Sequence, residues 1–302
     1  MTGAVLVTGG TGRIGTAFVH AMAARGEEVR VGTRSPQGLA AAVHAGFGST
    51  VRPVRIDPSD PEGLDLAMQG VDRVLLVSPL QDLETWHRAL GRACVRAGVR
   101  HVVKVSVQGA RPASAESPPG PFPAAHYRGE AILRGMELAT TMIRPTIFAQ
   151  HVGMLSPALF SPGDDVLCLP IGQGTVAWLD ARDIGICAAA ILSTPSAMAQ
   201  WDSAAFDLTG PRALPGAEVA SVLSAVGGRP VEWDADPDRF ARRTARRNAP
   251  DVFRHVYAEA ADGWFSAVHP DAFESLVGRA PTSFHKFAYD HRHAFTARTS
   301  PN

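Results

Sequence analysis

A glycine-rich loop near the start of the chain has the spacing of a phosphate-binding motif. It follows the apolar run Ala4-Val5-Leu6-Val7 and precedes a helical pattern. Glycines at positions 9, 12 and 15 permit a tight turn, close approach of backbone N–H groups to a pyrophosphate, and close packing of helix on strand. We therefore predict a dinucleotide site at six residues: Gly9, Thr11, Gly12, Arg13, Ile14 and Gly15. A plain turn is the alternative interpretation.

The residues after the next strands indicate which dinucleotide is bound. Sites selective for NAD usually place Asp or Glu after the second strand to hold the ribose 2′-hydroxyl, whereas this chain has Arg34. A guanidinium suits a 2′-phosphate through charge-assisted hydrogen bonds, so the predicted cofactor is NADP(H). A solvated surface arginine is the alternative. Asp57 is a candidate adenine contact, and Ser78 and Pro79 are candidates for lining the cofactor, although turn chemistry explains each equally well.

Two further clusters of polar residues are interpreted as structural. Five arginines lie at helical spacing in the second half of the chain: Arg239, Arg242, Arg243, Arg246 and Arg247. Nearby aspartates dilute this charge, so we expect a solvated helix face rather than a nucleic-acid site. Three histidines near the C-terminal end, His285, His291 and His293, lack the spacing that puts two imidazoles on one helix face. No metal site is expected.

The pattern of elements predicts an α/β fold that positions the glycine-rich loop. Six strands are expected in the first half, at Val5–Thr8, Val29–Gly32, Val51–Ile56, Arg73–Val77, His101–Val107 and Thr140–Arg144. Helices are expected between them, at Ile14–Arg25, Pro61–Gln69, Leu83–Ala97 and Ala124–Arg134. Strands that alternate with helices imply parallel pairing, and several strands are apolar throughout, which is typical of a sheet covered on both faces. The sequence therefore predicts a doubly wound, Rossmann-type parallel sheet.

The remaining segments suggest a second, smaller lobe. Arg111 to Pro123 contains five prolines and is expected to form a long loop beside the ligand crevice. After Gln150 the pattern becomes irregular, with a helix from about Ala181 and further helices from Gly216. We predict a dinucleotide-binding domain at 1–150, a mainly helical substrate lobe at 151–302, and a return to the first domain at 176–192.

The overall composition indicates which kinds of molecule the protein binds and in which cellular compartment it works. The 29 basic and 29 acidic residues cancel, so no net field attracts nucleic acid or an anionic membrane. The three cysteines form no C-x-x-C pair, which fits a reducing cytoplasm. No segment resembles an export signal or a membrane span. The expected partners are a small-molecule substrate and other copies of the chain, as in a homodimer.

Seven segments over nearly the whole chain carry a resemblance to a known family. They are Gly9 to Gly15, Thr33-Arg34, His126 with Glu130, Thr141 to Phe148, Asp180 to Ile184, Leu208-Thr209-Gly210-Pro211 and Gly278 to Phe287. In these segments the chain resembles the NmrA-like, atypical branch of the short-chain dehydrogenase/reductase superfamily, which includes isoflavone reductase-like and triphenylmethane reductase-like enzymes. The resemblance implies that Pro145, Thr146 and Phe148 contact the nicotinamide and line the substrate pocket, a plain strand-to-loop transition being the alternative.

The resemblance also identifies candidate catalytic residues. Ordinary members of the superfamily use a Tyr as acid or base and a Lys four residues later, positions that correspond here to Phe122 and His126. His126 is a candidate ribose contact or proton relay, or else a histidine satisfied inside a helix. Ser106 is a candidate for orienting a carbonyl, or else a strand cap. Tyr127 is a weaker candidate acid, because adjacent helical residues point in different directions.

The missing hydroxyl at Phe122 restricts the chemistry. Reduction of a simple carbonyl needs a proton donor, so hydride transfer is expected to a conjugated acceptor that spreads the charge, such as a quinone, an enone or a cationic aromatic. The leading hypothesis is an NADPH-dependent oxidoreductase, suited by its composition to bacterial specialised metabolism. A non-catalytic NADP(H)-binding redox sensor and a non-redox biosynthetic enzyme on the same scaffold are the alternatives.

Overall fold

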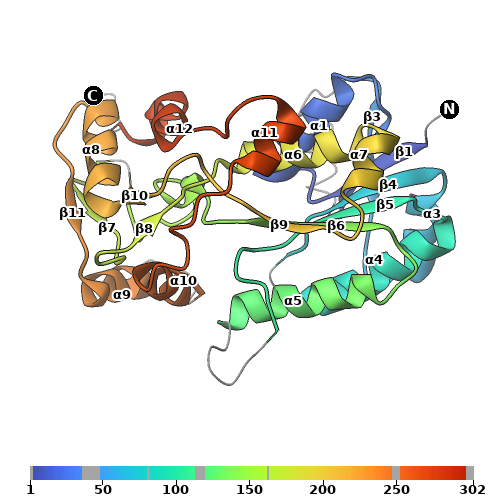
Figure 1. Cartoon of the computed structure of the whole chain (residues 1–302), viewed down its shortest axis with the longest axis horizontal. Coiled ribbons are helices and arrows are strands. Elements are labelled where there is room, and N and C mark those ends of the chain that lie inside the picture. The colour runs from blue at the N-terminus through green and yellow to red at the C-terminus, as the bar shows by residue number, and fades with distance from the viewer. Residues whose placement is uncertain are drawn as a thin grey trace. The chain divides into compact units, whose positions relative to one another are not determined.

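The computed structural model describes residues 3–35, 48–79, 82–112, 120–161, 163–246 and 252–296. The chain divides into two compact units (Figure 1). The first comprises Met1–Pro145, Ala181–Asp207 and Ser275–Gly278, and the second comprises Thr146–Asp180, Leu208–Glu274 and Arg279–Asn302. The first unit therefore ends five residues before the predicted boundary, and the chain returns to it from Ala181 instead of Val176.

A seven-stranded sheet forms the centre of the first unit, in the order β3-β2-β1-β4-β5-β6-β9. The strands are β1 (Ala4–Thr8), β2 (Val29–Thr33), β3 (Val51–Arg55), β4 (Val71–Leu76), β5 (His101–Val105), β6 (Thr140–Pro145) and β9 (Ala205–Leu208). The pairs from β3 to β6 are parallel. Strands β1 and β5 are buried along their whole length, as both faces of the sheet are covered. The predicted doubly wound sheet is confirmed, with β9 as an additional strand.

Helices cover both faces of this sheet, with α3, α4 and α5 on one face and α1, α6 and α7 on the other (Figure 1). Their bounds are α1 (Arg13–Ala23), α3 (Pro61–Met68), α4 (Leu83–Ala97), α5 (Pro121–Arg134), α6 (Ala181–Leu192) and α7 (Pro195–Gln200). Individual residues determine where several of these helices begin or end. Asp60 caps α3 by accepting a hydrogen bond from the Gly63 N–H at 2.9 Å, and Gly98, with φ of 68°, ends α4.

The start of α5 corrects one sequence prediction. Residues 121–123 were expected in the proline-rich loop, yet α5 begins at Pro121. Proline is compatible with the first turn of a helix, where its missing N–H has no intrahelical acceptor to lose. Pro121 and Pro123 therefore start the helix, which places Phe122 on it. The loop positions 113–119, including Pro118 and Pro119, lie outside the described residues.

The second unit combines short strand pairs with helices around its own core. Strand β7 (Val166–Cys168) pairs in parallel with β11 (Glu232–Asp234), and β8 (Thr175–Val176) pairs antiparallel with β10 (Leu214–Pro215). Its helices are α8 (Gly216–Gly227), α9 (Pro237–Arg246), α10 (Val252–Ala261) and α12 (Phe284–Asp290), with 3-10 turns at Ala149–His151 and Arg292–Ala294. The division between the units falls within α11 (Asp271–Val277), after Glu274. Large aromatic side chains, among them Trp178, Tyr257 and Phe287, are almost fully buried in this core.

Across the described ranges, no helix is both long and apolar enough to cross a membrane.

Candidate functional site

The glycine-rich loop joins β1 to α1 in a conformation that depends on its glycines. Gly9 has φ of 65°, in the left-handed region that favours glycine. A Cβ added at Gly15 would lie 2.4 Å from the Gly9 carbonyl oxygen and 2.5 Å from the Gly10 Cα. Helix α1 thus packs against the loop at a distance that excludes any side chain at Gly15.

The residues of this loop divide between exposed and buried positions. Gly9, Thr11, Gly12 and Arg13 are exposed, whereas Ile14 is buried, as is Gly15. Gly12 precedes α1, and it provides no side chain to cap the helix. The first N–H groups of a helix need an acceptor from outside the helix, and the positive end of the helix dipole favours an anion. A Cβ at Gly12 would lie 3.3 Å from the Gly9 oxygen, so this tight turn favours glycine.

Arg34 and Asp57 lie near one another beyond the ends of β2 and β3. The Arg34 guanidinium is exposed and lies 5.5 Å from the ring centroid of Trp86. The Ser59 hydroxyl donates to the Asp57 carboxylate at 2.6 Å and lowers the pKa of that carboxyl, an effect to which Arg55 and Arg34 add. Arg34 is thus oriented by an aromatic face, with its charge directed to solvent on the side where β2 ends.

Ser78 and Pro79 follow β4 and are both half-buried. The Ser78 hydroxyl oxygen lies 3.3 Å from His87 Nε2. Burial, followed by the charge of Lys104, lowers the pKa of His87 to about 3. The His87 ring is therefore neutral at physiological pH. It packs against Gly129, where a Cβ would lie 2.6 Å from Nδ1.

A buried ionic network connects α5 with the ends of β5 and β6. The Ser106 hydroxyl donates to Glu130 Oε1 at 2.5 Å. Arg144 donates to both carboxylate oxygens of Glu130, at 2.9 and 2.6 Å, and Arg134 Nη1 lies 3.0 Å from Oε2. Burial alone would raise the pKa of Glu130, but the hydrogen bonds from Arg144 and Ser106 outweigh it and the pKa is lowered. Glu130 is an ionised carboxylate with no exposed surface.

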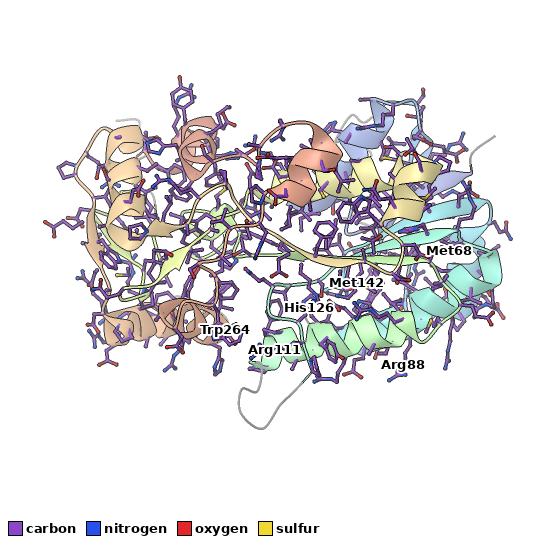
Figure 2. The ribbon with its side chains drawn as sticks, viewed as in Figure 1. Met68, Arg88, Arg111, His126, Met142 and Trp264 are labelled. Atoms are coloured by element: carbon purple, nitrogen blue, oxygen red, sulfur yellow. The ribbon has the colours of Figure 1, made fainter. Side chains whose placement is uncertain are left out.

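His126 lies one helical turn before Glu130, on the side of α5 that faces the sheet (Figure 2). Its Nδ1 is 3.2 Å from Lys104 Nζ, and the edge of Phe122 packs against its ring at a centroid distance of 4.7 Å. The buried Nε2 has no hydrogen-bond partner in the described part of the chain. Burial, with the charges of Lys104 and His87, lowers the pKa of His126 well below 6.5. The ring is neutral, with one nitrogen engaged by Lys104 and one left for another group.

Lys104 is the site residue that sequence reasoning missed. It lies in the middle of β5 and has no exposed surface. It contacts His126, and the charge of Glu130 acts on it. The available signal was a lysine within the otherwise apolar strand Val102-Val103-Lys104-Val105, two positions before Ser106 and therefore on the same face of the strand.

The other candidates lie in different surroundings. Tyr127 is half-buried. Pro145 is buried at the end of β6 in the first unit. Thr146 and Phe148 belong to the second unit, where the Thr146 N–H donates to the Leu208 carbonyl at 3.0 Å and the buried Thr146 hydroxyl has no partner among the described residues. The first unit therefore brings together Ser106 and His126, which join Lys104 and Glu130 in one cluster.

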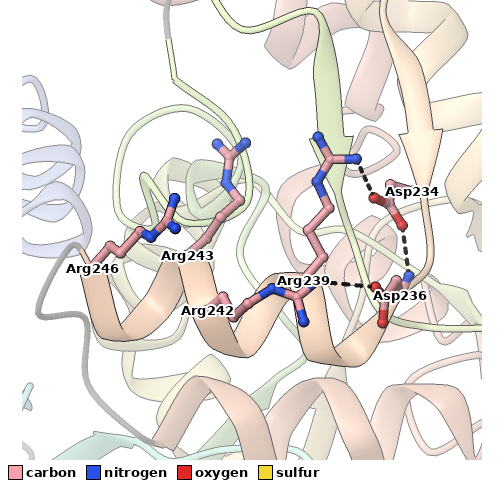
Figure 3. A pocket seen from close by; sticks show the side chains of 6 residues that line it. All are labelled: Asp234, Asp236, Arg239, Arg242, Arg243 and Arg246. Carbon is pink, nitrogen blue, oxygen red and sulfur yellow. Dashed lines mark hydrogen bonds and ion pairs between the residues drawn. The ribbon is translucent and has the colours of Figure 1, made fainter.

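The arginine cluster of the second unit forms a paired helix face. Arg239 and Arg242 are exposed on α9 and face Asp234 at 2.7 Å and Asp236 at 3.6 Å (Figure 3). Arg243 pairs with Asp164, while Arg247 lies outside the described residues. These pairs support the expectation of a solvated face, because carboxylates compensate most of the positive charge.

The histidines and phenylalanines near the C-terminal end divide between two short helical turns. Phe284 and Phe287 lie on α12, whereas Phe295 follows the 3-10 turn. The three rings therefore come from two separate turns, and all three are buried. The chain bends at His291, and Phe295 reaches the same core from the second turn.

Comparison with known proteins shows the family of the chain. Residues 1–259 match the NmrA-like family. The NAD(P)H azoreductase of Xenophilus azovorans is 32% identical over 301 residues, which cover 97% of this chain and 99% of the relative. The (4-alkanoyl-5-oxo-2,5-dihydrofuran-3-yl)methyl phosphate reductase of Streptomyces griseus is 29% identical over 96% of this chain and 99% of that protein.

A solved structure shows the same fold. The NADP(H) complex of the triphenylmethane reductase of a Citrobacter species superposes with a TM-score of 0.79 at 19% identity, covering 95% of this chain and 99% of that one. The predicted Rossmann-like fold and the family resemblance are both confirmed. By its matched length and by the identity of its relatives, this chain belongs to the NmrA-like family.

Proposed function

We propose that this protein is an NADPH-dependent reductase of small conjugated electron acceptors. The observation that carries the proposal is the turn before α1, a cradle whose shape needs glycine: Gly9 has a positive φ, and a Cβ at Gly15 would clash with the backbone of Gly9 and Gly10. Such a cradle at a helix N-terminus fits a pyrophosphate. The names of two relatives that align over nearly the whole chain, an azoreductase and a reductase of a dihydrofuranyl methyl phosphate, support reduction as the chemistry.

The cofactor is held by residues at the carboxyl ends of the parallel strands. Backbone N–H groups from Thr11 to Gly15 bind the pyrophosphate, and the Arg34 guanidinium binds the 2′-phosphate of the adenosine ribose. Asp57 contacts the adenine. Ser78 and Pro79 line the nucleotide beyond β4, and Pro145 lines it beyond β6.

The chain's own residues favour acceptors whose negative charge is delocalised. NADPH supplies the hydride when it is bound. Phe122 supplies no hydroxyl to protonate a simple alkoxide, and His126 is neutral, so any proton leaves its ring from Nε2 as a weak acid. A quinone, an azo bond or an enone spreads the incoming charge and needs only weak acid assistance. The substrate is a small molecule of this kind.

Turnover of NADPH by the purified protein tests the proposal. The assay compares NADPH oxidation with a quinone, an azo dye, a conjugated enone and a simple aliphatic ketone. Conjugated acceptors are expected to turn over and the ketone is not. Efficient reduction of the ketone would contradict the acceptor class, and tight NADPH binding without turnover of any acceptor would favour a regulatory nucleotide-binding protein instead.

A matched pair of variants locates the cofactor. Gly12→Asp places a carboxylate at the entrance to α1, where it obstructs and repels a phosphate, and it is expected to raise the Kd for NADPH at least about 100-fold. Ala24→Asp adds the same charge at the other end of the same helix and is expected to leave the Kd within about threefold. Equal effects of the two substitutions on NADPH binding, measured by nucleotide fluorescence, would contradict the assigned site.

A further inference from the structure

We propose that Lys104 is the proton source when the acceptor must gain a proton as well as a hydride. The proton passes from Lys104 through His126 to the acceptor. This inference rests on the proposed reductase function and extends it to the source of the second hydrogen. Lys104 does not contact the acceptor in this scheme. It is a positioning and proton-supplying residue that acts through the imidazole of His126.

The geometry gives the two side chains complementary roles. Lys104 Nζ lies 3.2 Å from His126 Nδ1 and 3.4 Å from the carbonyl oxygen of Val105. An ammonium has only donors, so it fixes Nδ1 as an acceptor and leaves the ring proton on Nε2. That nitrogen has no partner among the described residues. The imidazole thus carries its proton on the buried nitrogen that no described protein group engages.

The choice of lysine at this position is informative. Of the 29 basic residues only two are lysines, Lys104 and Lys286. Lys286 is exposed and pairs with Asp290 on α12. A buried arginine would remain charged at any physiological pH, whereas a buried lysine can release its proton. Almost every other basic residue of this chain is an arginine. A lysine at the buried position 104 therefore fits a role in which the side chain must release its proton.

The surrounding charges set the proton affinity of Lys104 near neutrality. Burial lowers its pKa to about 7, the positive charges of Arg144 and Arg134 act in the same direction, and Glu130 opposes them. His126 from α5 and His87 from α4 face the same space and are both held neutral by burial. The amine therefore exists in both forms at physiological pH, as a general acid should.

The proton transfer balances without any additional reactant. The ammonium of Lys104 transfers a proton to His126 Nδ1 while the Nε2–H of the same ring transfers its proton to the reduced acceptor. A quinone that has received a hydride and this proton becomes a hydroquinone. The imidazole then holds its proton on Nδ1, and Lys104 is neutral. When the product leaves, a proton from solvent binds Nε2 while Nδ1 returns its proton to Lys104, which restores the ammonium and the first tautomer together. No electrons pass through either residue.

Two classes of acceptor separate this role from a structural one. A neutral quinone needs one hydride and one proton, whereas a triarylmethyl cation becomes a neutral product with the hydride alone. Lys104→Met keeps a long apolar stem of similar size and leaves Glu130 paired with Arg144 and Arg134. We expect the quinone rate of this variant to fall about 100-fold relative to its rate with the cationic dye. The quinone rate of the unmodified protein should decrease as pH rises through about 7, and this limb should disappear in the variant.

The matched control and a spectroscopic measurement complete the test. Lys286→Met removes the other lysine and should change neither rate. Lysine labelled with 13C at Cε gives two signals, and the one lost in Lys104→Met should titrate between about pH 6 and pH 8. Equal loss of both rates in Lys104→Met, or a Lys104 signal without titration in that range, would overturn the relay alone. Failure of the unmodified protein to reduce either acceptor would overturn the reductase function, and the relay with it.

Discussion

At the scale of single residues, Glu130 determines how the buried cations of the first unit are arranged. Its carboxylate accepts hydrogen bonds from Ser106 and Arg144 and an ion-pair contact from Arg134. A buried ion pair contributes little net stability compared with apolar residues, but loss of one partner leaves charges without compensation. The main role of Glu130 is therefore to compensate the positive charges of Arg144 and Lys104 inside the protein.

Removal of this charge should be strongly destabilising. Glu130→Gln is expected to lower the free energy of unfolding by about 3 kcal/mol, because Arg144 and Lys104 lose their buried counter-charge. Urea denaturation measures the change. Asp65→Asn is the control, since its partner Arg96 and the aspartate are each 47% exposed, and it should cost less than about 1 kcal/mol. Similar losses in the two variants would show that the buried network has no special role.

The pH dependence of this effect has a defined sign. The pKa of Glu130 is lowered from 4.5 in the folded protein, so its ionised form contributes stability that is fully present above that value. The contribution is lost as pH falls through the lower, folded pKa. The stability difference between the unmodified protein and Glu130→Gln should therefore shrink below pH 4.5. A constant difference down to the acid transition would contradict this account.

At the scale of elements, the packing of α6 on α1 holds the helix that carries the nucleotide cradle. A Cβ added at Gly185 would lie 2.3 Å from the Ile14 carbonyl oxygen and 2.7 Å from the Phe18 N atom. Both contacts are to the backbone of α1, which cannot rotate away as a side chain can. Gly185 thus controls how closely the two helices approach, and with it the position of the first turn of α1.

A single methyl group at this contact should have two effects. Gly185→Ala is expected to destabilise the protein by about 1–3 kcal/mol through overpacking, and to weaken NADPH binding by displacement of α1. Gly135→Ala is the control, because its Cβ would make ordinary contacts, 3.4 Å from the Ala131 oxygen and 3.6 Å from the Ile132 oxygen, and its φ is −78°. Thermal unfolding and nucleotide titration measure both effects. If Gly185→Ala bound NADPH as tightly as the unmodified protein, the packing of α6 on α1 would have no influence on the nucleotide site.

At the scale of the whole molecule, the reactivity of the three cysteine thiols measures whether the core of either unit opens. Cys94 and Cys187 lie in the first unit and Cys168 in the second, and all three are free and buried. Burial raises the pKa of the Cys94 thiol to about 12, and it raises the pKa values of Cys187 and Cys168 as well. Thiols of this kind are inert, because the thiolate is the reactive form.

The thiols should therefore react only when a core opens. With an excess of an aromatic disulfide reagent at neutral pH, the native protein is expected to show no rapid phase, and three thiols should react in denaturant. Saturating NADPH should slow the native reaction of the Cys94 and Cys187 thiols, because a ligand that binds only the folded state reduces opening. Rapid modification of one thiol in the native protein would show a local opening that this burial does not predict.

Short-range patterns were sufficient to predict much of this protein. The cradle from Gly9 to Gly15 and the alternation of strands and helices are local features, since a tight turn or a period of two or 3.6 residues is visible in the sequence itself. The prediction that Arg34 binds a 2′-phosphate rests on the same kind of pattern, its position directly after a strand. Proline at the start of α5 was misassigned because the same residue type favours both a loop and a first helical turn.

The sequence by itself determined the parallel sheet, the glycine cradle, and the absence of a hydroxyl at Phe122, because each depends on neighbouring residues. Only the tertiary structure decided which polar groups meet inside the protein. Lys104 is 22 positions from His126, and Ser106 is 24 from Glu130. The parallel crossover from β5 to α5 brings them together in the interior of the first unit. In that space burial holds His126 neutral and lowers the pKa of Lys104, because a charge far from water depends on its neighbours.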